Sequence, residues 1–69
     1  MEDKEFLKQL GLRLKCQRIM KDLSVQAVSK QTGLHRATIN LIEKGAKDFH
    51  VLNLKRIATA YGIELKEVF

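Results

Sequence analysis

The residues that could carry out chemistry are few in this sequence of 69 amino acids, and they are widely spread. There is one cysteine, Cys16, and there are two histidines, His35 and His50, which together lack the spacing of a zinc finger or zinc ribbon. No serine, histidine and acidic residue stand at a usable spacing for nucleophilic catalysis, and the chain is too short for a large pocket. The sequence therefore predicts no enzyme, no metal site and no cofactor.

The basic residues are the more informative group. The chain has 13 Lys/Arg and 8 Asp/Glu, which gives a net charge of +5. Between Phe6 and Thr59 eleven basic residues stand against three acidic ones, so this middle part carries +8 while acidic residues gather at the two ends. Such a concentration suits a polyanion, because each cation placed near a phosphate releases condensed counterions. A solvated basic surface without a partner would explain the charge equally well.

The distribution of charge also bears on the compartment. No uncharged stretch approaches the ~20 residues needed to cross a bilayer. Four charged residues at positions 2–5 stand where the apolar part of a signal peptide would begin. We therefore expect a cytoplasmic protein without a membrane partner, folded as a single domain over residues 1–69.

The apolar spacing predicts helices. Leu7, Leu10 and Leu14 recur at intervals of three and four, which predicts a first helix over about 3–22. Gly11 inside it indicates either close packing or a weak point. A fourth helix is expected over 51–61, followed by one or two further turns within 64–69. No useful alternation of apolar and polar residues exists, so the fold class is all-α.

Two shorter helices are expected between these, joined by a tight turn. Ser24 is a suitable N-cap for a helix over 25–31, and Gly33 can end it in the left-handed conformation. A helix over 35–44 follows, with Ile39 and Ile42 on its inner face. Two short helices that cross closely need a small residue on the first, which Ser29 supplies, and a glycine in the turn. This spacing predicts a helix-turn-helix unit over residues 25–44.

The sequence resembles the Cro/cI-type, XRE-like helix-turn-helix family of phage repressors and bacterial regulators over residues 10–69. The motifs that carry the resemblance are Leu23-Ser24, Gly33-Leu34, Ala37-Thr38-Ile39, Ile42-Glu43-Lys44-Gly45 and Ile57-Ala58-Thr59-Ala60-Tyr61-Gly62-Ile63. It implies a compact, five-helix, lambda-repressor-like DNA-binding domain with the motif at its second and third helices. Residues 1–9 would extend the first helix, and Thr32 stands where the family usually has an apolar residue.

The resemblance also implies which residues would meet DNA. The second helix of such a motif lies in the major groove with its first residues at the base edges. The implied base contacts are His35, Arg36, Ala37, Asn40 and Leu41, and the implied phosphate contacts are Gln26, Lys30, Thr38, Lys44 and Lys47. Arg36 can bond O6 and N7 of guanine together, whereas Asn40 can read adenine or bond a phosphate. Leu41 would contact a base or a partner, or is an ordinary exposed leucine.

Structural and partner roles follow from the same resemblance. Arg18 and Glu43 are expected to form a structural ion pair. The residues expected at a dimer interface are Leu52, Leu65, Val68 and Phe69, some of which would belong to the core of the single chain. The expected function is that of a homodimeric transcriptional regulator that binds a near-palindromic DNA operator and needs no small-molecule ligand. The alternative is a protein-interaction module, such as an antitoxin, with the same fold.

Overall fold

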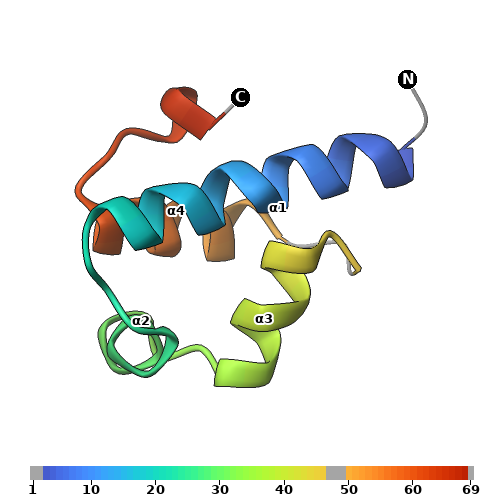
Figure 1. Cartoon of the computed structure of the whole chain (residues 1–69). Helices are drawn as coiled ribbons and strands as arrows, with labels where there is room; N and C mark the ends of the chain where they lie inside the picture. Colours follow the sequence, from blue (N-terminus) through green and yellow to red (C-terminus); the bar gives the residue numbers. More distant parts are fainter. Residues whose placement is uncertain (1–2, 47–49, 69) are drawn as a thin grey trace.

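The computed structural model describes residues 3–46 and 50–68, and these residues form an all-helical fold without strands (Figure 1). The elements are α1 (Asp3–Met20), α2 (Val25–Thr32), α3 (Arg36–Lys44), α4 (Val51–Tyr61) and η1 (Leu65–Val68). The all-α prediction is confirmed. The count of five helices is slightly wrong, because the last element is a single 3-10 turn.

α1 ends two residues earlier than the sequence predicts, because the chain turns at Asp22. This residue has a φ of 57°, in the left-handed region. The Asp22 N–H donates to the Ile19 carbonyl at 3.0 Å, and the Leu23 N–H donates to the Arg18 carbonyl at 3.1 Å. These bonds close the last turn of α1. Aspartate is one of the few residues other than glycine that occasionally adopt this conformation.

Side-chain hydrogen bonds hold both ends of α2. The Ser24 hydroxyl accepts the Ala27 N–H at 3.0 Å, as expected of an N-cap. The Thr32 hydroxyl donates to the Val28 carbonyl at 2.8 Å and accepts the Leu34 N–H at 3.2 Å. This polar side chain is therefore satisfied locally, and α2 runs one residue further than predicted.

One apolar core joins all five elements. Its buried members are Leu10, Leu14, Val28, Ile39, Ile42, Leu54, Ile57, Tyr61 and Val68. In Figure 1, α1 runs across the molecule with α2 and α3 below it and η1 above it. Removing these side chains from water is the main favourable term for so short a chain.

Two glycines bring the backbones of α1 and α3 into contact. A Cβ atom on Gly11 would lie 2.6 Å from the carbonyl oxygen of Glu43, and one on Gly45 would lie 2.5 Å from Cα of Lys8. Neither position has room for a side chain. Of the two interpretations of Gly11, the structure supports close packing.

Within the described residues, no helix combines the length and the apolar character that a membrane span requires.

Candidate nucleic-acid interface

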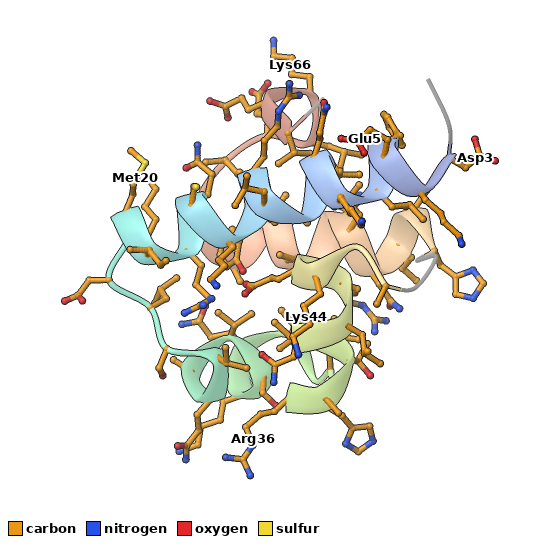
Figure 2. The ribbon with its side chains drawn as sticks, turned by 45° about the vertical axis from the view of Figure 1, so that its right-hand side comes forward. Asp3, Glu5, Met20, Arg36, Lys44 and Lys66 are labelled. Carbon is orange, nitrogen blue, oxygen red and sulfur yellow. The ribbon has the colours of Figure 1, made fainter. Side chains whose placement is uncertain are left out.

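The two faces of α3 differ sharply in exposure. Ile39, Ile42 and Glu43 are buried on its inner face. The residues predicted to contact bases lie together on its exposed side, at His35, Arg36, Ala37, Asn40 and Leu41. Figure 2 shows Arg36 projecting from the first turn of α3, at the opposite end of the molecule from Lys66 in η1. The structure thus places these five residues on one surface, and their contact with bases remains a prediction.

The outer face of α3 consists of two rows. Arg36, Asn40 and Lys44 are spaced by four residues, which places them in one polar row along the helix. Ala37 and Leu41 form the neighbouring apolar row, and Leu41 is 40% exposed. A helix with this surface offers hydrogen-bond donors and small apolar contacts side by side, which is the chemistry that the major groove can receive.

The predicted phosphate contacts that the structure describes lie on α2 and α3. Gln26 and Lys30 are exposed on α2, Lys44 is exposed in the last turn of α3, and Thr38 is half-buried. Lys47 lies outside the described residues. The sequence predicts that α3 begins at His35, but His35 occupies the N-cap position just before the helix. Its side chain makes no capping hydrogen bond. The first N–H groups of α3 thus lack a side-chain cap from this residue.

Arg18 and Glu43 form a bidentate ion pair that ties α1 to α3. The Arg18 Nε donates to Glu43 Oε2 at 2.8 Å, and its Nη2 donates to Oε1 at 3.2 Å. Nη1 donates to the Leu23 carbonyl at 2.9 Å, just before α2. The two side chains are only 14% and 6% exposed. The pair therefore links α1 with both sides of the helix-turn-helix unit.

Tyr61 is a third member of this network, and the sequence interpretation missed it. Its hydroxyl donates to Glu43 Oε2 at 3.2 Å from α4. Burial raises the pKa of Tyr61, and the adjacent Glu43 charge raises it further. The hydrogen bond with Glu43 raises the pKa of Arg18. A signal was available, because a buried carboxylate accepts more hydrogen bonds than one arginine fork supplies.

The residues predicted at a dimer interface differ in how far they are exposed in the single chain. Leu52 on α4 is 57% exposed, whereas Leu65 is half-buried against the core. Val68 is 0% exposed within the single chain, so it offers no surface to a second copy. Its side chain packs entirely into the core from η1. Phe69 lies outside the described residues.

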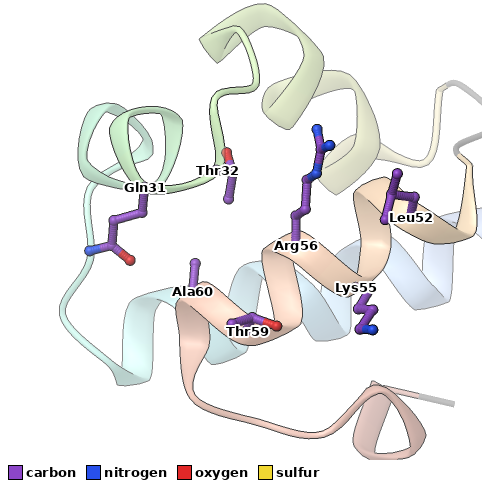
Figure 3. Close-up of a pocket in the computed structure, with 7 residues that line it drawn as sticks. All are labelled: Gln31, Thr32, Leu52, Lys55, Arg56, Thr59 and Ala60. Atoms are coloured by element: carbon purple, nitrogen blue, oxygen red, sulfur yellow. The ribbon is translucent and has the colours of Figure 1, made fainter.

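A groove of about 450 Å³ opens between α2 and the outer face of α4. It is lined by Gln31, Thr32, Leu52, Lys55, Arg56, Thr59 and Ala60. Figure 3 shows that Arg56 and Lys55 leave α4 in opposite directions, with Arg56 directed toward α3. The groove lacks acidic side chains, and it is separate from the outer face of α3.

Other reactive groups do not form a site in the described part of the chain. Cys16 is exposed on α1. No three His, Cys, Asp or Glu side chains among residues 3–46 and 50–68 come together as metal ligands.

Comparisons with known proteins agree with this geometry. The helix-turn-helix family model HTH_3 matches residues 4–68. The structure is similar to the restriction-modification controller protein C.AhdI from Aeromonas hydrophila, with a TM-score of 0.91 and 32% identity over 94% of this chain and 98% of that one. It is also similar to an HTH_3 family transcriptional regulator from Vibrio cholerae, with a TM-score of 0.90 and 28% identity over 99% of this chain and 38% of that one. No curated protein sequence matches at a significant level. The chain belongs to the XRE-like helix-turn-helix family HTH_3.

Proposed function

We propose that this protein is a transcriptional regulator that binds double-stranded DNA in a sequence-specific manner, as a homodimer on a near-palindromic operator. The observation that carries the proposal is the exposed outer face of α3, which presents Arg36, while the Arg18–Glu43 ion pair holds the inner side of the same helix against α1. Membership in the helix-turn-helix family supports it. So does the likeness to a restriction-modification controller and to a transcriptional regulator.

The stretch from His35 to Leu41 would read the sequence. A guanidinium at Arg36 can donate to O6 and N7 of one guanine, a contact worth about 1–3 kcal/mol of discrimination. Ala37 and Leu41 can contact thymine methyl groups, since both are exposed and apolar. His35 stands at the N-cap, next to this row.

A second set of residues would hold the protein on the duplex without reading it. Gln26, Lys30, Thr38, Lys44 and Lys47 form this set, with Gln26 and Lys30 on α2. Contacts to phosphate oxygens fix register and orientation and carry no sequence information. The described members lie on α2 and α3, the two helices of the motif, which suits contact with phosphates beside the groove that α3 would enter.

A dimer would supply the affinity and length of site that one motif lacks. A single helix-turn-helix reads few base pairs, and dimers bind half-sites about one helical turn apart. Leu52 offers apolar surface on α4, and Leu65 in η1 is partly exposed. We propose that these residues and Phe69 take part in pairing, without Val68.

The first experiment selects bound sequences from random DNA and then measures affinity by fluorescence anisotropy. Binding is expected to weaken by about 10³–10⁵ between 50 and 200 mM salt if 6–10 phosphates are contacted. Arg36→Ala should relax base preference at one position of each half-site, while Lys30→Ala should weaken binding to all sequences alike. Salt-insensitive binding, or no binding by the wild type, would contradict the proposal.

The second candidate function is a protein-interaction module such as an antitoxin. The exposed Leu52 beside the α2–α4 groove favours it, because an apolar side chain at the edge of a concave surface suits a protein partner. Such a complex would depend weakly on salt and would survive Arg36→Ala. The same titration therefore separates the two candidates.

A further inference from the structure

A small hollow lies between α1 and α3, at one edge of the outer face of α3. It measures about 110 Å³ and is lined by Lys15, Arg18, Asn40, Glu43 and Lys44. Since one water occupies about 30 Å³ in the liquid, the hollow has room for a group the size of a phosphate. Lys15 comes from α1, and Asn40 and Lys44 come from α3, so the hollow exists only where the two helices cross.

The charge in this hollow favours an anion. Three cationic side chains and one carboxylate line it, which leaves a net charge of +2. The carboxylate is that of Glu43, and its oxygens already accept hydrogen bonds from Arg18 and Tyr61. Lys15 and Lys44 are exposed, and neither forms an ion pair within the described residues. Two free ammonium groups and the Asn40 amide remain to bind a ligand.

The location identifies the anion. Asn40 and Lys44 continue the row that begins at Arg36, so the hollow adjoins the outer face of α3. A helix placed in the major groove has the sugar-phosphate backbones along its flanks. On the flank of α3 that faces α1, the anion within reach is therefore a backbone phosphate.

We propose that Lys15, Asn40 and Lys44 bind one backbone phosphate of DNA between α1 and α3. This inference rests on the proposed function. It adds Lys15 of α1 to the contact surface and assigns Asn40 to positioning rather than to reading adenine. Because the site spans two helices, the phosphate would fix the angle at which α3 enters the groove.

The test compares Lys15→Gln with Lys4→Gln. Both remove one exposed lysine charge from α1, and position 4 lies about 16 Å away along the helix. Anisotropy titrations over a range of salt would use the selected operator and a scrambled duplex. Lys15→Gln should weaken binding to both duplexes by roughly 5-fold and lower the salt slope by about 1, whereas Lys4→Gln should match the wild type.

A second measurement locates the phosphate. Uncharged methylphosphonates replace the operator phosphates one at a time. At one position the replacement should cost the wild type more affinity than it costs Lys15→Gln, because that variant has already lost one of the three contacts to this phosphate. Asn40→Ala should weaken binding to the operator and the scrambled duplex alike.

The outcomes separate the two proposals. Wild-type DNA binding that Lys15→Gln leaves unchanged would overturn the phosphate site alone. The phosphate site would also be overturned if, at every position, the affinity lost to the methylphosphonate were the same in Lys15→Gln as in the wild type. If Asn40→Ala relaxes one base preference instead, the assignment of Asn40 is wrong. Absence of DNA binding by the wild type would overturn the proposed function itself.

Discussion

The two sides of the helix-turn-helix unit are joined to the rest of the molecule in different ways. On the α1–α3 side, Gly11 and Gly45 allow backbone contact, and the Arg18–Glu43 ion pair crosses the same junction. On the α2–α4 side, a groove of about 450 Å³ separates the outer parts of the helices. The α1–α3 side is therefore the tightly packed one, and the α2–α4 side is the loosely packed one. The contrast indicates that the orientation of α3 relative to α1 is the most firmly held feature of this fold.

The loose side places fewer demands on its residues. Leu52 is 57% exposed at the groove, and Lys55, Arg56 and Thr59 are exposed as well. Substitutions there should affect partners more than folding, whereas substitutions at the α1–α3 junction should affect folding directly.

Arg18→Met should have the largest effect. It leaves the Glu43 carboxylate buried without its cation, which costs about 3 kcal/mol or more of unfolding free energy. Urea denaturation followed by circular dichroism measures the loss. The double variant Arg18→Met/Glu43→Met removes both charges and should recover much of the stability. A double variant less stable than Arg18→Met would show that the pair is not the source of the loss.

Gly11→Ala should cost about 2 kcal/mol, because the added methyl group meets the backbone of Ile42 and Glu43. The matched change on the loose side is Ala60→Leu, which extends a side chain into the α2–α4 groove. It should alter the unfolding free energy by no more than about 0.5 kcal/mol. Equal losses in the two variants would remove the distinction between the two sides.

Tyr61→Phe should cost about 1.5 kcal/mol through loss of a hydrogen bond to a charged acceptor. Because the pKa of Tyr61 is raised by burial, the folded state holds this proton more tightly than the unfolded state. Wild-type stability should therefore fall as the pH rises above about 10, the ordinary tyrosine pKa. Denaturation at a series of alkaline pH values measures this slope. Tyr61→Phe should show a shallower decline, and equal slopes would contradict the assignment.

The sequence predicted the parts of the fold that depend on local pattern. The bounds of α4 were predicted at both ends, because glycine and apolar spacing mark them clearly. The end of α1 was missed because Asp22 adopts a left-handed conformation that aspartate takes only in some contexts. The last element was expected as a helix of one or two turns, and only four residues of 3-10 helix form.

The site residues could be predicted from the sequence where the pattern of a single helix determines which side chains are exposed. The outer residues of α3 follow from its apolar face, so their common surface was expected. Tyr61 and Lys15 were missed as neighbours of Glu43 and Lys44, because those contacts depend on how separate helices cross. Val68 was assigned to an interface because spacing alone does not distinguish a core residue from an apolar residue on the surface.

The backbone contact at Gly11 has a consequence for how the molecule opens. α1 and α3 share surface there, so α3 cannot detach without exposing the centre of α1 to water. Amide hydrogens in the middle of both helices should then exchange with solvent only through cooperative unfolding of the whole domain, whereas those of η1 exchange through local opening. A partly opened state in which only η1 has come away would thus keep α3 packed on α1.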